Sequence, residues 1–290
     1  MFKKILVCVD PYPPDHKLIS CAVSLKKLGA EEVVLAHIIV DAPPGLDKTL
    51  IAQARPELER QKQILEEAGL KPSIAIQSGI PAHALNDLAE KEDASVIIIG
   101  AQGRGLLESI TLAGNPLGNV SAKLLHITRR PLLLIPGALP AMEAGRELPD
   151  LFAHILYPTD FSDTAEIAFA YLESVVRATQ CPVTMLHVQD RSKPAPHLGH
   201  HPKELQNLDQ LRLQRLQCWL QGLGAEDVRI DLAQGSPGDE IVKKAKAESC
   251  SLILMGTQGK SITREILLGS VAHHVARHGA LPVLFIPAIQ

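Results

Sequence analysis

The sequence predicts an α/β protein with two doubly wound, five-stranded parallel sheets, one in each half of its 290 residues. Two observations carry this prediction. The second half repeats the first, so that "KKILVCVD" near the start matches "AHILYPTD" at 153–160. Each half also alternates short apolar segments with longer amphipathic ones, and strands that are apolar on both faces imply a parallel sheet covered by helices on both sides.

The repeat sets the expected domain organisation. Three further pairs of segments match: 31–41 with 181–190, 73–105 with 229–261, and 118–136 with 269–287. Each half is long enough to bury a core of its own. We therefore expect a first domain over residues 1–137, a second over 151–290, and a linker over 138–150.

Strands and helices of the second half follow one another in the order that this fold class requires. Short apolar segments predict five strands: 154–157, 182–188, 228–234, 251–255 and 282–287. The first helix is expected to begin at Ser162 or Asp163, because both are good N-cap residues. Its apolar face carries Ala168, Tyr171, Leu172 and Val175.

Three more helices are expected between the later strands. The second runs over roughly 203–221 and should bury five apolar side chains: Leu205, Leu208, Leu216, Trp219 and Leu220. The third begins with Ser236 as N-cap, Pro237 at the first helical position and Asp239 in a capping box. The fourth is capped by Ser270 and ends at Gly279.

Composition and charge exclude several classes of protein. Aromatic residues make up only 3% of the chain and the net charge is −3, so the stacking surfaces and basic patches of nucleic-acid-binding proteins are missing. No apolar run approaches the length that spans a bilayer. The five cysteines are scattered and odd in number, which favours reduced thiols. We therefore expect a cytoplasmic protein that binds neither nucleic acid nor a membrane.

The stretch "GTQGKS" directly follows a predicted strand and looks like the end of a phosphate-binding P-loop. That motif requires a glycine five residues before Gly259, where Leu254 stands, so a P-loop is not expected. Gly256 and Gly259 instead form the first part of a longer pattern. Nine residues after Gly259 comes a second pair, Gly269 and Ser270.

The two pairs are suited to hold a phosphate chain between them. Glycine lets the backbone turn sharply and approach a ligand closely at a strand end. At Gly269 and Ser270 a helix begins, and the free N–H groups and positive dipole end of a helix favour an anion. Lys260 and Arg264 in the connecting loop can offset phosphate charge. The alternative is that the glycines serve only as turns and Ser270 only as a cap.

Asp160 is the expected ligand for a ribose or a metal ion. In a doubly wound sheet, ligands bind beyond the carboxyl ends of the strands, where the strand order reverses. Asp160 ends the first strand of this half and Gly256 ends the fourth, so both face one crevice if those strands are neighbours. A carboxylate suits ribose hydroxyls or a metal ion, and main-chain groups near His187 and Val188 are placed to read a base edge.

The segments "ILYPTDFSDTAEIA" and "GTQGKSITREILLGSVA" closely resemble the ATP-binding branch of the universal stress protein (UspA) family. The resemblance covers nearly the whole chain, twice over. It implies a tandem-domain member with an adenine nucleotide alpha hydrolase-like fold, strand order 3-2-1-4-5, that binds ATP, or AMP or ADP, with Mg²⁺ or Mn²⁺. With Lys260 from the loop, the expected nucleotide-binding residues are Pro158, Thr159, Asp160, Val188, Met255, Gly256, Gly259, Gly269, Ser270 and Val271.

The first half departs from this pattern. Its matching residues are Asp10, Gly100, Gly103, Gly118 and Asn119. Fourteen residues rather than nine separate the second and third glycines, and asparagine replaces the serine. Asn119 can still cap a helix, but the inserted "TLAGN" lengthens the loop where phosphates would lie. We therefore expect the first site to be altered and weaker.

Two groups of histidines are candidate metal or catalytic sites. His197, His200 and His201 share a Pro-rich loop, and His273, His274 and His278 share the last helix. No matching cluster of cysteines or carboxylates accompanies them, and the sequence contains no nucleophile elbow or HExxH motif. We therefore expect neither a metal site nor a catalytic centre at these histidines.

Three functions are left open by the residues. They are an ATP-binding regulatory protein, a slow ATPase with Asp160 as general base, and a scaffold that binds no nucleotide. The intact pair of Gly269 and Ser270 favours the first, and the lack of an evident water-activating group argues against an efficient enzyme. The fifth strands, "PLLLIP" and "PVLFIP", are expected sheet edges that invite pairing. The resemblance implies that the two halves pair as an intramolecular pseudo-dimer, with a homodimer as a further option.

Overall fold

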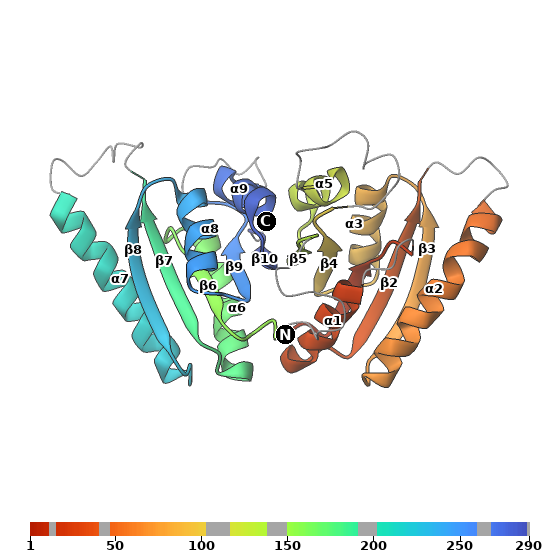
Figure 1. Ribbon diagram of the computed structural model, residues 1–290, viewed down its shortest axis with the longest axis horizontal. Coiled ribbons are helices and arrows are strands. Elements are labelled where there is room, and N and C mark those ends of the chain that lie inside the picture. Colours follow the sequence, from red (N-terminus) through yellow and green to blue (C-terminus); the bar gives the residue numbers. More distant parts are fainter. Residues whose placement is uncertain are drawn as a thin grey trace. The chain divides into compact units, whose positions relative to one another are not determined.

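The structure is a computed structural model that describes residues 1–11, 16–40, 47–102, 117–137, 150–190, 202–259 and 268–288. The chain divides into two compact units, Met1–Leu148 and Pro149–Gln290. All of the predicted linker except Asp150 lies outside the described residues. Both units alternate strands and helices along the chain (Figure 1).

The first unit contains a parallel sheet in its described residues. Its strands are β1 (Lys4–Cys8), β2 (Glu32–Ile39), β3 (Lys71–Ser78), β4 (Val96–Gly100) and β5 (Leu132–Ile135). They pair in the order β3-β2-β1-β4-β5. Its helices are α1 (His16–Ser24), the 3₁₀-helix η1 (Leu25–Leu28), α2 (Asp47–Glu67), α3 (Pro81–Lys91) and α5 (Asn119–Ile127).

The second unit repeats this arrangement. Its strands are β6 (Ile155–Pro158), β7 (Val183–Gln189), β8 (Val228–Gln234), β9 (Leu252–Gly256) and β10 (Val283–Ile286), in the order β8-β7-β6-β9-β10. Its helices are α6 (Asp163–Thr179), α7 (Pro202–Gly222), α8 (Pro237–Ala247) and α9 (Ser270–His278). The predicted α/β class and the strand order 3-2-1-4-5 are thus confirmed in both units.

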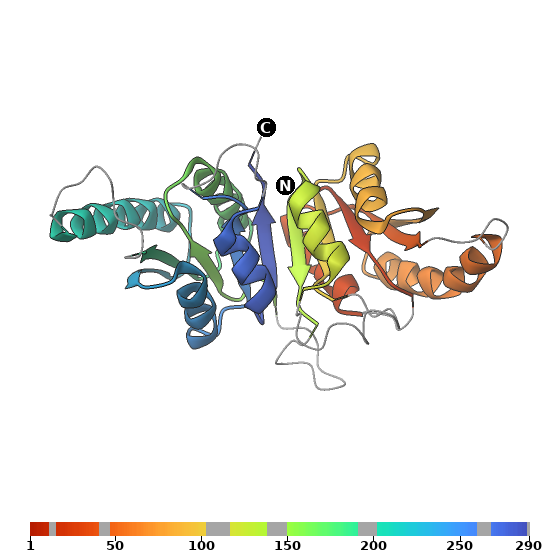
Figure 2. The same cartoon turned by 90° about the horizontal axis from the view of Figure 1, so that it is seen from above.

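Helices cover both faces of the second sheet, with α6 and α7 on one face and α8 and α9 on the other (Figure 2). This explains why β6 and β10 are buried along their whole length. The first strand, β6, pairs with both β7 and β9, so the strand order reverses between β6 and β9. Residues just past the carboxyl ends of these two neighbours therefore face one crevice, as expected for Asp160 and Gly256.

The predicted start of α6 is confirmed. Ser162 is the N-cap, and its side-chain oxygen accepts a hydrogen bond from the Ala165 N–H at 3.3 Å. Of the predicted apolar face, Ala168, Leu172 and Val175 are buried and Tyr171 is half-buried. An i, i+4, i+7 pattern places these side chains on one stripe of the helix, against the sheet.

The predicted buried face of α7 is wrong in part. Leu208 and Trp219 are 43% and 55% exposed. Leu220 is buried as predicted, whereas Asp209 and Leu213 are buried on the same helix although they were not predicted. More apolar residues lie along this helix than one face can bury, so hydrophobicity alone does not choose the buried stripe. Of the other two predicted core positions, Leu216 is half-buried and the Leu205 side chain lies outside the described part of the chain.

Two predicted caps also differ from the structure. Ser236 is the N-cap of α8, but its side chain makes no capping hydrogen bond, and Asp239 Oδ1 lies 3.0 Å from His274 Nε2 instead of closing a capping box. Gly269 is the N-cap of α9 and Ser270 is its first helical residue.

All five cysteines lie in the described residues and none is in a disulfide there; four are buried and Cys218 is exposed. Burial raises the pKa of Cys250 to about 12, so its thiol is a packing group rather than a nucleophile.

Among the helices of the described residues, none has the length and apolar character needed to cross a bilayer.

The contact between α8 and α9 yields a stability prediction. A Cβ on Gly238 would lie 2.6 Å from His274 Cδ2 and 2.9 Å from its Cβ, so Gly238→Ala forces the two helices apart. We expect a loss of about 1–3 kcal/mol in the free energy of unfolding, measured by urea denaturation. The control is Gly222→Ala, because none of the described residues lies within 4 Å of the added methyl at the end of α7. Adding His274→Ala to Gly238→Ala removes the ring contact at 2.6 Å but keeps the Cβ contact at 2.9 Å, so it should recover stability in part, and a double variant no better than the single would contradict the clash with the ring.

Candidate functional site

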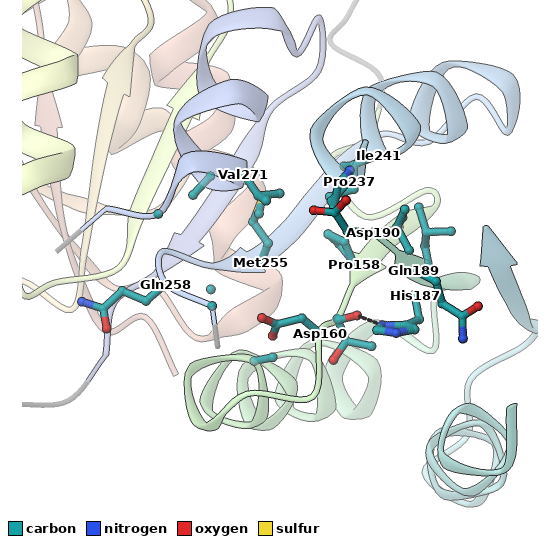
Figure 3. A pocket seen from close by; sticks show the side chains of 18 of the residues that line it. Pro158, Asp160, His187, Gln189, Asp190, Pro237, Ile241, Met255, Gln258 and Val271 are labelled. Carbon is teal, nitrogen blue, oxygen red and sulfur yellow. Dashed lines mark hydrogen bonds between the residues drawn. The ribbon is translucent and has the colours of Figure 1, made fainter. Parts of the chain in front are cut away.

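A cavity of about 500 Å³ lies at the carboxyl ends of β6, β7 and β9 in the second unit (Figure 3). Its walls come from strand ends, from α7, and from the first turns of α8 and α9. Ten predicted nucleotide-binding residues line it: Pro158, Thr159, Asp160, Val188, Met255, Gly256, Gly259, Gly269, Ser270 and Val271. Lys260 and Arg264 lie outside the described residues.

One side of the cavity is formed by the N-terminus of α9. The Gly269 N–H donates to the Thr257 carbonyl at 2.7 Å, which ties the helix start to the end of β9. The first intrahelical bond of α9 runs from the His273 N–H to the Gly269 carbonyl at 2.9 Å. Three residues precede that bond and line the cavity: Ser270, Val271 and Ala272. Their N–H groups and the helix dipole favour an anion at this side.

Close packing explains why Gly256 and Gly259 are glycines. A Cβ on Gly256 would lie 2.8 Å from Thr164 Cγ2 and 3.1 Å from its carbonyl oxygen. A Cβ on Gly259 would lie 2.5 Å from Asp160 Oδ2. Neither glycine has a positive φ, so neither is needed for an unusual turn. Close packing, rather than a left-handed turn, is therefore what favours glycine at both positions.

The Asp160 carboxylate is held by a tight turn between β6 and α6. Asp160 Oδ1 accepts from the Ser162 N–H at 3.1 Å, and Thr159 Oγ1 accepts from the Phe161 N–H at 3.1 Å. Between them, Phe161 has a φ of 57°. A bulky side chain in this left-handed region is strained and needs support from its surroundings.

The opposite side of the cavity contains residues that the sequence patterns missed. Helix α7 contributes Leu208, Asp209 and Arg212, and α8 contributes Pro237 and Ile241. Five further missed residues lie at the strand ends and in the turns that follow them: Leu186, Gln189, Asp190, Thr257 and Gln258. His187, near which main-chain groups were expected to read a base edge, also lines the cavity. One feature of the sequence could have indicated this side of the cavity: Asp209 is a carboxylate four residues before Leu213, and so falls on the same apolar stripe of the helix.

His187 and Asp209 join the strand ends to α7. His187 Nδ1 lies 2.7 Å from the Thr159 carbonyl oxygen (Figure 3), and its Nε2 lies 3.5 Å from Asp209 Oδ2. The Gln189 amide donates to the same Oδ2 at 2.9 Å, while Arg212 Nη1 lies 3.5 Å from Oδ1. The Asp209 charge is therefore surrounded by polar groups although the residue is only 3% exposed.

The first unit keeps the backbone of this site and only some of its side chains. The Gly118 N–H donates to the Ala101 carbonyl at 2.6 Å, matching the bond from Gly269 to Thr257. Asn119 is the first residue of α5 and is exposed. Among the described residues, a Cβ on Gly100 would meet the Gln102 carbonyl oxygen alone, at 3.5 Å. Asp10 lies just past the end of β1, whereas Gly103 and the "TLAGN" segment lie outside the described residues.

Only one of the two groups of histidines lies in the described residues. His197, His200 and His201 lie outside the described residues. Within the parts of the chain that the structure describes, no three His, Cys, Asp or Glu side chains are grouped to hold a metal ion. On α9, His274 contacts Asp239, and His278 Nδ1 lies 3.0 Å from the His274 carbonyl oxygen.

Comparison with known proteins gives one consistent family. The model of the universal stress protein family matches residues 1–136 and 152–287. A universal stress protein from Mycolicibacterium smegmatis is 24% identical over 97% of this chain and 96% of its own length. Another, from Methanocaldococcus jannaschii, is 32% identical over 47% of this chain and 95% of its own length. The crystal structure of a universal stress protein from Archaeoglobus fulgidus has the same fold, with a TM-score of 0.72, 22% identity and coverage of 97% of this chain and 95% of that one.

The two units supply a matched pair of glycine variants. Gly256→Ala would press on the Thr164 backbone, whereas the equivalent Gly100→Ala meets an ordinary contact distance. We expect Gly256→Ala to lower the free energy of unfolding by about 1–3 kcal/mol, and Gly100→Ala to change it by less than about 1 kcal/mol. Urea denaturation followed by circular dichroism measures both, and equal losses would show that the contact with Thr164 is unimportant.

Proposed function

The chain belongs to the universal stress protein family, and on that premise we propose that its second unit binds an adenine nucleotide, ATP in the first place, as a regulatory protein of the stress response. The observation that carries the proposal is the cavity of about 500 Å³, which is lined both by Asp160 and by the first turn of α9. Its volume is typical of small-molecule sites. AMP and ADP contain the same nucleoside and are alternative ligands.

The chemistry of the two sides supports one orientation of the nucleotide. Phosphates suit the first turn of α9, where N–H groups and the helix dipole provide positive potential. Gly259 leaves room beside Asp160 that a side chain would fill, so a ribose hydroxyl can reach the carboxylate. The base then lies toward Val188 and Ile241, which supply apolar contact surface.

A divalent cation fits this proposal as a companion of the phosphates. Mg²⁺ is commonly held by one or two carboxylates together with substrate phosphates, rather than by an all-protein cage. Asp160 is the residue placed to contribute such a carboxylate, and no group of three ligating side chains is found among the described residues. Mg²⁺ or Mn²⁺ would neutralise phosphate charge when bound.

We propose binding rather than catalysis as the function, since family members are generally not classical enzymes. A slow ATPase is the alternative, with Asp160 as general base. Turnover that disappears in Asp160→Ala but persists in Asp10→Ala would favour hydrolysis. A cytoplasmic location and the pairing of the two halves through their fifth strands stay predictions from the sequence.

Nucleotide binding is tested by comparing the two equivalent aspartates. We expect Asp160→Ala to weaken ATP affinity by about ten- to a hundredfold, because a charge-assisted hydrogen bond to the ligand is lost. Asp10→Ala should leave the affinity of the second unit unchanged. Isothermal titration calorimetry with ATP and Mg²⁺ measures both, and Asp160→Asn separates the charge from the turn, since its amide oxygen can still accept from the Ser162 N–H.

Direct analysis of bound ligand provides a second measurement. Denaturing the purified chain should release an adenine nucleotide, and saturating ATP should raise the melting temperature, because ligand binding to the folded state stabilises it. A chain that releases no nucleotide and shows no thermal shift with ATP and Mg²⁺ would favour the scaffold function instead.

A further inference from the structure

The side chain of Asp209 is unusual for its place in the fold. It lies on α7, on the stripe that packs against the sheet together with Leu213 and Leu220, and it is 3% exposed. Aspartate is almost never buried in this way unless it is paired, because desolvation of a carboxylate is costly. A buried charge at the edge of a cavity therefore calls for an explanation in terms of its partners.

The groups that contact Asp209 in the described residues belong to the nucleoside side of the cavity. His187 and Gln189 are two residues apart on β7, so their side chains point to the same face of the sheet, toward α7. Both contact Asp209 Oδ2, at 3.5 Å and 2.9 Å respectively. Arg212, one turn further along α7, lies 3.5 Å from the other oxygen. The carboxylate thus links the helix to the end of the strand.

The His187 ring also contacts the residue that follows β6. A carbonyl oxygen can only accept, so Nδ1 must carry the proton in its 2.7 Å contact with Thr159. Nε2 faces Asp209 Oδ2 at 3.5 Å, and because a carboxylate oxygen is also an acceptor, this contact holds the ring when both of its nitrogens carry protons. The Thr159 carbonyl immediately precedes Asp160, the residue expected to meet the ribose.

The same cluster supports the strained residue of the turn. The Phe161 ring lies 4.7 Å from the His187 ring and 5.3 Å from the Arg212 guanidinium, measured to ring centroids. His187 and Arg212 also contact Asp209. A left-handed Phe161 persists only when its surroundings hold it, and these two side chains pack against its ring.

The first unit shows the arrangement without the carboxylate. Helices α2 and α7 each have 21 residues, and aligning them places Ala54 opposite Asp209 and Glu57 opposite Arg212. The histidine is retained, since His37 Nδ1 lies 3.1 Å from the Val9 carbonyl oxygen. Alanine at this helix position is therefore compatible with the fold, and the carboxylate is a feature of the second unit.

We propose that Asp209 is a positioning residue for the nucleoside side of the cavity, which holds His187 and Arg212 and thereby the turn that presents the Asp160 carboxylate. The proposal rests on nucleotide binding by the second unit. It assigns to α7 a part in ligand affinity, although both Asp209 oxygens already face protein groups. Loss of Asp209 should therefore weaken the binding of adenosine and of ATP equally, because both contain the nucleoside that Asp160 contacts.

The test uses three substitutions in the full chain. Asp209→Leu fills the space without an acceptor, Asp209→Ala reproduces the first unit, and Asp209→Asn keeps one oxygen for the Gln189 amide. We expect Asp209→Leu and Asp209→Ala to weaken adenosine and ATP alike by about five- to thirtyfold, and Asp209→Asn to lose less. The control is Gln214→Ala, an exposed position on the same helix that does not line the cavity.

A spectroscopic measurement distinguishes this proposal from the proposed function. The ring nitrogen shifts of His187, measured by NMR without ligand, should change in Asp209→Asn and stay constant in Gln214→Ala. Unchanged shifts, or wild-type affinity in Asp209→Leu, would overturn the positioning role. If the unaltered chain binds neither adenosine nor ATP, the proposed function fails, while the His187 shifts still decide whether Asp209 positions the ring.

Discussion

The close approach of Gly259 to the Asp160 carboxylate is the constraint on which the site depends. It exists because β6 and β9 are parallel neighbours, so the chain leaves the sheet at the same edge after each of them. A side chain at Gly259 would occupy the space beside Asp160 Oδ2, and one at Gly256 would push away the start of α6. Sheet topology and two missing side chains together keep this edge open, and the cavity forms there.

Comparing equivalent positions of the two units shows which features belong to the fold and which belong to the site. Both units bond the start of their last helix to the residue after the fourth strand, Gly118 to Ala101 and Gly269 to Thr257. That bond belongs to the fold. The tight contacts of Gly256 and the carboxylate on α7 are found in the second unit, whereas the equivalent Gly100 has an ordinary contact distance. Equal backbones with unequal side chains are what one expects when only one copy keeps a binding role.

The sequence predicted the strands and the glycine pairs, because both follow from local rules. Buried parallel strands show as continuous apolar runs, and close backbone approach shows as glycine. The face of α7 was mispredicted, since Leu208 and Trp219 are exposed and Asp209 is buried. No local rule places a carboxylate inside, because its partners His187 and Gln189 are about twenty residues away in the chain and meet it only when β7 packs beneath α7. The loop with Lys260 lies outside the described residues, so its predicted role stays a prediction.

Substitutions on helix α7 can change such a site with the smallest loss of stability of the fold. The strand ends are restricted by backbone pairing and the glycine turns by close contact, so most substitutions there disturb the sheet itself. A covering helix meets the sheet through side chains alone, and an exchange such as that between Ala54 and Asp209 leaves its backbone intact. Because Asp209 acts on Asp160 through His187 and the Thr159 carbonyl, one helix position can alter the geometry of the ribose side without touching the phosphate side. Differences in ligand preference between the two units are therefore expected to arise first at α2 and α7.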